Sequence, residues 1–332
     1  MTKDKQRYSN AFTATLSGIT DLFRKQKNVV SLSDKERLDG KNILITGASS
    51  GLGFEAAVQL AKRGAHIWMA CRSGIPEKGE QVKKRSGSNH VEMMHVDLSD
   101  LDSIVALVNK LKAASVKLDI LVDNAGMVPN KSRKTKQGLE EMFVVNYFSK
   151  YCLTRLLLDH NLFNNPDKNI PRIIYVVSES HRNPGAFDWD NFGAYKEYSM
   201  GKTVEYYGYY KLLLATFANE LSRKINSPDQ VNYSVFALCP GPVNSNIARE
   251  APAIFKPLLK AVFKIFFRSP EVAVQPVIYF AASPEVKGKA MDYLFLMGRK
   301  DMDAKAMDEA NGQRLWQLSE TLLKEYGMVF RA

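Results

Sequence analysis

The feature that most constrains this chain is the glycine-rich stretch Thr46-Gly47-Ala48-Ser49-Ser50-Gly51-Leu52-Gly53. An apolar run ends just before it and predicts a buried parallel strand, and the Ala- and Leu-rich run behind it predicts a helix. A helix that starts at such a turn presents free N–H groups and a partial positive charge to the phosphates of a dinucleotide. Gly47 then permits the sharp turn, Gly51 lets the backbone approach a pyrophosphate, and Gly53 lets the helix pack closely on the strand. The alternative is an ordinary tight turn, but the position between a strand and a helix favours the dinucleotide site.

The glycines of this turn are spaced G-x-x-x-G-x-G rather than G-x-G-x-x-G. With its sequence T-G-A-S-S-G-L-G, the turn resembles the cofactor-binding turn of the short-chain dehydrogenases/reductases. The resemblance implies an α/β fold, with a single Rossmann-type doubly wound parallel sheet of about seven strands and helices on both faces. It also implies that the turn contacts the cofactor through Gly47, Ser49, Ser50, Gly51, Leu52 and Gly53.

The composition is typical of a folded α/β protein, since 45% of the 332 residues are hydrophobic and 24% are charged. We expect one Rossmann domain over residues 40–332, preceded by a helical extension over residues 1–39. The three cysteines lie far apart, which argues against a disulfide framework and indicates a reducing compartment. The five histidines form no H-x-x-x-H pair, so no metal site is expected.

The formal net charge of +11 is compatible with an anionic partner, such as a membrane surface, nucleic acid or a phosphorylated cofactor, or with solubility alone. No nucleic-acid recognition motif is visible, so we do not expect nucleic acid to bind. The sequence shows no signal peptide and no run of about 20 apolar residues, which predicts a cytoplasmic location. The oligomeric state is left open.

Two amphipathic segments leave peripheral membrane contact open. Residues 11–27 carry an apolar stripe at helical spacing followed by basic residues, and residues 253–268 carry a basic residue at every fourth position beside an aromatic-rich face. Such segments can lie on an anionic bilayer, or they can pack on the outside of the domain. In the family a variable substrate-covering segment falls at about 246–270, so the second segment could equally be a lid over a lipophilic cavity.

The residue that follows the second predicted strand bears on cofactor choice. An NAD site usually has Asp or Glu at this place to accept from the ribose 2′-hydroxyl. Here Cys71 is followed by Arg72, and the next acid is Glu77. A guanidinium suits a 2′-phosphate through charge-assisted hydrogen bonds, so we predict NADP(H) in preference to NAD(H). The alternative is a surface arginine.

Further cofactor contacts are implied by the family resemblance. Asp97 matches the Asp that meets the adenine, although it could instead cap the helix that begins near Ser99. The family's N-N-A-G segment reads D-N-A-G here, with Asp123 in place of the first Asn, and Asn124 could be structural because a buried Asn often ties strands together. The run Cys239-Pro240-Gly241-Pro242-Val243-Asn244-Ser245 resembles the family's P-G-x-V-x-T. The implied contacts are Asp97, Leu98, Asn124, Ala125, Gly126, Pro240, Gly241, Val243 and Ser245.

Two Tyr–Lys pairs compete for the role of catalytic base. A Tyr and a Lys four residues apart lie on one helical face, and both Tyr198–Lys202 and Tyr207–Lys211 have this spacing. A strong helical run follows Lys211, whereas Gly201 and the residues behind it weaken the helix around the first pair. Since Y-G-Y-Y-K-L also resembles the family's Y-x-x-S-K-L, we choose Tyr207 and Lys211, which the family places against the cofactor as well.

Two more catalytic positions are implied by the resemblance. Ser178 ends the fifth predicted strand and matches the family's catalytic Ser, with Ser180 as an alternative that the sequence does not exclude. Asn146, in a predicted helix over 137–160, matches the Asn whose backbone helps to hold a water of the proton relay. In the mechanism that the family implies, Ser178 binds the substrate oxygen and Tyr207 exchanges a proton with it. Lys211 holds the ribose, and its charge and that of an oxidised nicotinamide favour the phenolate.

The C-terminal run R-L-W-Q-L-S-E-T-L and the triplet Ala70-Cys71-Arg72 resemble the retinol-dehydrogenase-like branch of the family, and the resemblance covers about residues 40–327. It implies an NADP(H)-dependent oxidoreductase acting on a lipophilic alcohol and its aldehyde or ketone, of retinoid, steroid or long-chain type. One alternative is a catalytically silent NADP(H)-sensing protein, which would usually lack the Tyr, Lys or Ser. Another is a protochlorophyllide-type reductase, for which no cysteine proton donor lies between Ser178 and Tyr207.

Overall fold

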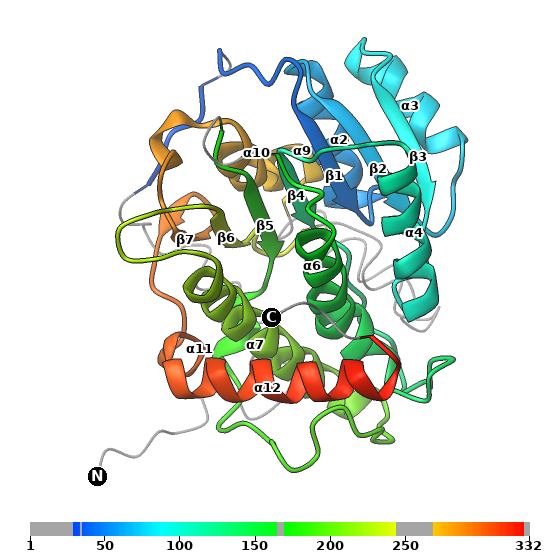
Figure 1. The fold of residues 1–332 in the computed structure, drawn as a ribbon, viewed down its shortest axis with the longest axis vertical. Helices are drawn as coiled ribbons and strands as arrows, with labels where there is room; N and C mark the ends of the chain where they lie inside the picture. The colour runs from blue at the N-terminus through cyan, green and yellow to red at the C-terminus, as the bar shows by residue number, and fades with distance from the viewer. Residues whose placement is uncertain (1–28, 34, 165–168, 244–267, 329–332) are drawn as a thin grey trace.

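Eight strands form one sheet in the part of the chain that the computed structural model describes, residues 29–33, 35–164, 169–243 and 268–328 (Figure 1). Their order is β3-β2-β1-β4-β5-β6-β7-β8, and only β8 pairs antiparallel to its neighbour. The expected parallel sheet is therefore confirmed, with the two-residue β8 as an addition. The strands are β1 (Asn42–Thr46), β2 (His66–Cys71), β3 (Val91–His95), β4 (Ile120–Asp123), β5 (Arg172–Val176), β6 (Ser234–Cys239), β7 (Met291–Phe295) and β8 (Gly298–Arg299).

Helices cover both faces of the sheet, and the buried apolar residues form a separate cluster on each face. On one face lie α2 (Gly51–Lys62), α3 (Glu77–Ser86), α9 (Pro270–Ala273) and α10 (Gln275–Ala282). On the other lie α4 (Leu101–Ala113), α5 (Glu141–Phe143), α6 (Ser149–Asp159), α7 (Met200–Ile225), α11 (Ala304–Met307) and α12 (Glu309–Glu325). Figure 1 shows α12 lying across α7 at the outside of that layer.

The order of the strands reverses between β1 and β4, which are neighbours in the sheet. In an open parallel sheet this reversal leaves a crevice outside the carboxyl ends of the strands, because the connections on its two sides run to opposite faces. The glycine-rich turn after β1, the D-N-A-G segment after β4 and Ser178 after β5 all follow strands at this edge. The fold therefore gathers the predicted site residues at one place.

Two helices differ from the sequence-based expectation. The predicted helix over 137–160 begins only at Glu141 and contains a π-helical turn, η1 (Val144–Phe148), before α6. Helix α7 begins at Met200, so the helix extends through Gly201 instead of ending before it. The cost of a glycine in a helix is conformational entropy, and the packing of the rest of α7 against the sheet outweighs it.

The segment just before β1 lies against the last strands of the sheet. The Val30 N–H donates to the Met297 carbonyl oxygen at 2.8 Å, and Val29 bridges Gly298 in antiparallel fashion. The proposed membrane-contacting segment 11–27, and residues 253–267 of the other one, lie outside the described residues, as does most of the expected lid. None of the helices in the described ranges combines the length and the apolar character needed to span a bilayer.

Candidate active site

The glycine-rich turn has the geometry expected of it. Gly47 has a φ of +66°, and its N–H donates to the Ala70 carbonyl oxygen of β2 at 2.9 Å. A Cβ on Gly53 would lie 2.5 Å from the Gly47 carbonyl oxygen, so only glycine allows α2 to start this close to β1. Among the described residues the Ser50 side chain caps no N–H of α2. The turn thus presents a helix N-terminus that fits a pyrophosphate.

Arg72 follows the last residue of β2, and its side chain is half exposed. Its Nη1 lies 3.7 Å from Oδ2 of Asp97, which follows β3. Asp97 also accepts from the N–H of Ser99 at 2.9 Å and from its hydroxyl at 2.6 Å. Burial raises the pKa of Asp97, but these hydrogen bonds and the charge of Arg72 outweigh it, so that the pKa lies below its usual value.

The alternative role considered for Asp97, the N-cap of the next helix, is wrong. Asp100 caps α4, because its side chain accepts from the Asp102 N–H at 3.1 Å. Leu98 is buried in the core between them. Asp97 is therefore held by Ser99 and Arg72 and remains available at the edge of the sheet.

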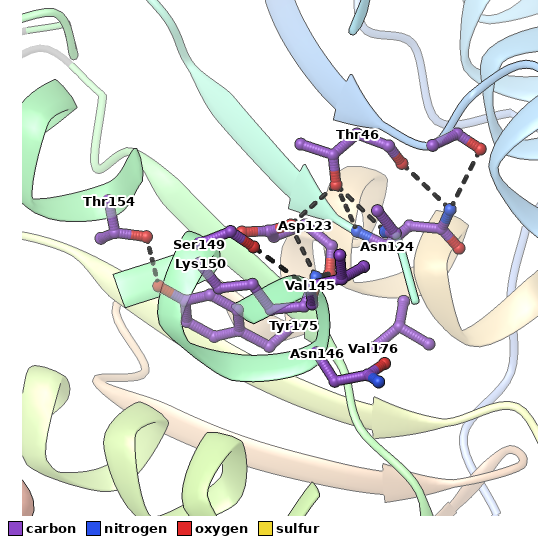
Figure 2. A network of polar contacts seen from close by, with 12 residues as sticks. Thr46, Asp123, Asn124, Val145, Asn146, Ser149, Lys150, Thr154, Tyr175 and Val176 are labelled. Carbon is purple, nitrogen blue, oxygen red and sulfur yellow. Dashed lines mark hydrogen bonds and ion pairs between the residues drawn. The ribbon is translucent and has the colours of Figure 1, made fainter. Parts of the chain in front are cut away.

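Asn124 ties β4 to the glycine-rich turn, as the structural alternative expected. Its Nδ2 donates to the carbonyl oxygen of Thr46 at 3.0 Å and to that of Gly47 at 3.4 Å. The Thr46 hydroxyl in turn accepts from the N–H groups of Asn124 and Ala125 at 3.0 and 3.1 Å. Figure 2 shows Thr46, at the end of β1, hydrogen-bonded to Asp123 and Asn124. These bonds fix the spacing between the turn and the D-N-A-G segment.

Ser178, Tyr207 and Lys211 meet at the carboxyl edge of the sheet. The Lys211 Nζ donates to the Val176 carbonyl oxygen, the last of β5, at 2.9 Å, and it lies 5.6 Å from the centre of the Tyr207 ring. The Ser178 side chain lies close enough to Tyr207 to lower the pKa of that phenol, and its hydroxyl accepts from the Ser180 N–H at 3.3 Å. This is the arrangement a proton donor needs beside a group that binds the same substrate oxygen.

Burial shifts the pKa values of both Tyr207 and Lys211 toward their uncharged forms. Burial raises the pKa of Tyr207, with a further contribution from Cys239, and the nearby Ser178 side chain opposes this rise only in part. Burial and the charge of Lys150 lower the pKa of Lys211 to about 7. Without cofactor, the two shifts favour a protonated phenol at Tyr207 and an uncharged amine at Lys211.

Asn146 lies in the π-helical turn and is buried close to these groups. Its Nδ2 donates to the carbonyl oxygens of Met127 and Met142 at 2.8 and 3.1 Å, and its Oδ1 accepts from the Met127 N–H at 3.2 Å. A Cβ on Gly126 would lie 2.9 Å from Asn146 Oδ1 and 3.7 Å from Lys211 Nζ, so both residues border the same glycine. π-helical turns occur frequently at functional sites.

The alternative residues are placed differently. The Ser180 hydroxyl is buried and has no hydrogen-bond partner among the described residues. The Tyr198 hydroxyl donates to Glu140 Oε1 at 2.8 Å, away from the sheet edge, while Lys202 is exposed on the first turn of α7. Tyr198 and Lys202 therefore do not form a second pair with the geometry of Tyr207 and Lys211.

The segment after β6 closes the other side of the site. Gly241 has a φ of +75°, and the Pro242 carbonyl oxygen accepts from the Arg268 N–H at 3.0 Å. Val243 bridges Arg268. Pro240 is buried at the end of β6, and Ser245 lies outside the described residues.

Sequence reasoning missed two groups that contact the segments carrying the site residues. His181 Nδ1 lies 2.6 Å from the Ser178 carbonyl oxygen, and its Nε2 accepts from the Asp303 N–H at 3.0 Å. Lys150 pairs with Asp123 below Lys211. A signal for the second was present, since a lysine inside the apolar run of 147–153 and an Asp in place of the family's Asn both depart from expectation.

Comparisons with known proteins agree with this geometry. The family model described as short chain dehydrogenase matches residues 41–253. Retinol dehydrogenase 14 of Homo sapiens is 31% identical over 307 residues, which cover 87% of this chain and 88% of that protein. Retinol dehydrogenase 13 of Homo sapiens is 30% identical over 316 residues, which cover 93% and 92%. The crystal structure of an uncharacterized protein from Mycobacterium Paratuberculosis has a TM-score of 0.68 at 24% identity, with 93% of this chain and all of that chain covered.

Proposed function

The chain belongs to the short-chain dehydrogenase family, in its retinol-dehydrogenase-like branch, and from this premise we propose that it reduces a lipophilic aldehyde or ketone with NADPH. The coarser assignment, an oxidoreductase that interconverts alcohols and carbonyls with a nicotinamide cofactor, follows from the family. The observation that carries the proposal is the meeting of Tyr207, Lys211 and Ser178 at the carboxyl edge of the sheet.

Arg72 supports the preference for NADP(H). Its half-exposed guanidinium stands where β2 ends, and the sequence places no acid there to accept from a ribose 2′-hydroxyl. The partner it has, Asp97, is 3.7 Å away and leaves the guanidinium N–H groups free to turn toward a 2′-phosphate. A guanidinium and a phosphate form charge-assisted hydrogen bonds of the strong kind.

The chain's own residues would divide the chemistry among them. The bound nicotinamide supplies the hydride. Ser178 hydrogen-bonds the substrate oxygen and aligns it with Tyr207, which donates the proton that the new alcohol needs. The partly buried Tyr207 phenol, with its pKa raised, suits this donor role in carbonyl reduction. Lys211 and Asn146, which border Gly126 together, hold the ribose side of the site and the path by which the proton is replaced.

A lipophilic substrate is supported by the relatives, two of which are named retinol dehydrogenases and match most of this chain. The loop between η2 (Glu179–Arg182) and α7 adds aromatic surface on the same side. Phe187 and Trp189 stack there with ring centres 4.3 Å apart, and both pack on the core at only partial burial. Retinoids, steroids and long-chain aldehydes are the compounds to test.

The test is a fluorescence titration with NADPH and NADH, followed by turnover on aldehydes and ketones of increasing chain length. We expect tighter binding of NADPH and turnover that increases with the apolar length of the substrate. Tyr207→Phe should abolish turnover and keep NADPH binding, while Tyr198→Phe serves as the matched control with turnover retained. Tight binding without turnover would instead favour a cofactor-sensing protein, and no binding of either cofactor would overturn the assignment of the glycine-rich turn.

A further inference from the structure

A buried ion pair lies directly beneath the candidate active site. Lys150 projects from the first turn of α6, and its Nζ lies 2.8 Å from Asp123 Oδ1 at the end of β4. The two side chains are 0% and 1% exposed. Figure 2 shows the lysine reaching from its helix to the strand end. Burying two charges is costly unless their geometry is good, so the pair requires an explanation beyond solvation.

The Asp123 carboxylate is also part of the framework around the cofactor turn. Its Oδ1 accepts from the Thr46 hydroxyl at 2.7 Å, and that hydroxyl accepts from the N–H groups of Asn124 and Ala125. Asp123 Oδ2 has no hydrogen-bond partner among the described residues. The carboxylate thus has capacity for a second cation that it does not use.

The second cation nearby is Lys211. Asp123 pairs in register with Tyr175 of β5, and the residue after Tyr175 is Val176, whose carbonyl oxygen accepts from Lys211. The two ammonium groups are therefore bound at the ends of the neighbouring strands β4 and β5, and the Asp123 carboxylate pairs with Lys150. The other groups that face Lys211 are Tyr207 on its own helix and the Cys239 thiol of β6.

We propose that Lys150 is a positioning residue of the active site, which occupies Asp123 and so withholds that carboxylate from Lys211. The proposal rests on the proposed function in one respect only, namely the effect of the Lys211 charge on turnover. Its consequence is a Lys211 ammonium that loses its proton near neutral pH, because burial disfavours the charged amine and Lys150 repels it while Asp123 is paired with Lys150. The direction agrees with the effects of Lys150 and Asp123 on the pKa of Lys211, which are opposite in sign.

Three variants should shift the titration of Lys211 in different directions, which a purely structural role of Lys150 would not produce. Lys150→Met removes the repelling charge and frees the carboxylate, so Lys211 should hold its proton to a pH about one unit higher or more. Asp123→Asn, which restores the family's usual residue, leaves Lys150 as an uncompensated charge and should shift the titration of Lys211 lower by about one unit. The double variant should lie between the two.

The first readout needs no cofactor. The free energy of unfolding is measured against pH for each protein and for the same protein carrying Lys211→Met, and the two curves are subtracted. Between the folded pKa of Lys211 and its unfolded value of about 10.4, the unfolded chain binds more protons, so the difference rises with pH. The pH at which the rise begins reports the Lys211 titration in the folded protein.

The rise should begin at higher pH in Lys150→Met and at lower pH in Asp123→Asn. Glu220→Gln is the matched control. It removes the charge of a different buried carboxylate, on α7, which pairs with Arg223 at 2.9 Å, and it should leave the pH at which the rise begins unchanged. If Lys150→Met does not fold, Asp123→Asn and the double variant still test the sign. Shifts in the same direction in both single variants, or no shift in either, would overturn the proposal.

The second readout is the alkaline limb of NADPH-dependent turnover. It should move with the same signs, upward in Lys150→Met and downward in Asp123→Asn. Correct shifts in the stability curves without any turnover would support the role of Lys150 and refute the proposed enzyme. Turnover with stability curves that do not shift would support the enzyme and refute the role of Lys150.

Discussion

The imidazole of His181 is held between two backbone groups, with Nδ1 2.6 Å from the Ser178 carbonyl oxygen and Nε2 accepting from the Asp303 N–H at 3.0 Å. Because Nε2 must be unprotonated to accept, Nδ1 carries the proton and donates it to Ser178. The ring therefore fixes the backbone of Ser178, two residues after the end of β5, and links it to the segment after β8. A second proton on the ring would break one of these bonds.

We expect His181 to make the protein less stable in mild acid. Burial lowers its pKa to about 4, below the unfolded value of about 6.5, so the unfolded chain binds more protons between these values. As the pH falls from about 6.5 to 4, the free energy of unfolding should decrease by up to about 3 kcal/mol through this group alone. Denaturant titrations of wild type and His181→Gln over that range measure it as a difference in slope. Parallel curves would show that His181 does not titrate as the burial predicts.

We expect the substitution of Ser178 to reduce turnover far more than the substitution of Ser180, although both serines lie just after β5. The Ser178 side chain lies beside Tyr207 and lowers its pKa, whereas the Ser180 hydroxyl has no partner among the described residues and only the Ser180 backbone N–H donates to Ser178. Ser178→Ala should lower kcat about a hundredfold or more, because the substrate oxygen loses an aligned donor. Ser180→Ala should change kcat by less than about threefold. Equal losses in the two variants would mean that the hydroxyls share the role or that Ser180 holds it.

Arg72→Ala tests the cofactor preference. Loss of a guanidinium that binds the 2′-phosphate should weaken NADPH by about tenfold to a hundredfold, as expected for hydrogen bonds to a charged group. NADH has no 2′-phosphate and serves as the internal control, with an unchanged dissociation constant. Fluorescence titrations of both cofactors against both proteins measure the effect. A loss of NADH affinity of the same size would mean that Arg72 supports the site without reading the phosphate.

The fold could be predicted from the sequence because its signals are local. The apolar runs that become β1 and β6 are buried along most of their length, and the turn after β1 has glycines where a Cβ would clash. Helix ends were less predictable. The helix over 137–160 starts later than predicted, because Glu140 caps it by accepting from the Phe143 N–H, a contact between a buried acid and the backbone that no apolar period reveals.

The motifs of the site could be predicted from the sequence, but the contacts that hold their residues in place could not. Tyr207 and Lys211 share one helical face, so their spacing alone predicts that they meet. The contacts of Lys150 with Asp123 and of His181 with Asp303 join residues 27 and 122 positions apart, and only the three-dimensional fold determines them. The lowered pKa of Lys211 has the same origin, because it depends on burial and on a charge from another helix.

Two glycine variants test where the backbone tolerates a side chain, one in the glycine-rich turn and one at the start of α7. Gly53→Ala should destabilise the protein by more than about 2 kcal/mol and abolish cofactor binding, because its Cβ would meet the Gly47 carbonyl oxygen at 2.5 Å and push α2 away from the turn.

At Gly201, in the first turn of α7, a Cβ would have no atom of the described residues within 4 Å, and the φ is not in the left-handed region. Gly201→Ala should therefore stabilise the protein by about 0.5–1 kcal/mol, since alanine restricts the unfolded chain and favours helix. Thermal and denaturant unfolding of both variants, with NADPH titrations, measure the contrast. A stable Gly53→Ala protein that still binds NADPH would show that the turn can open without loss of the site.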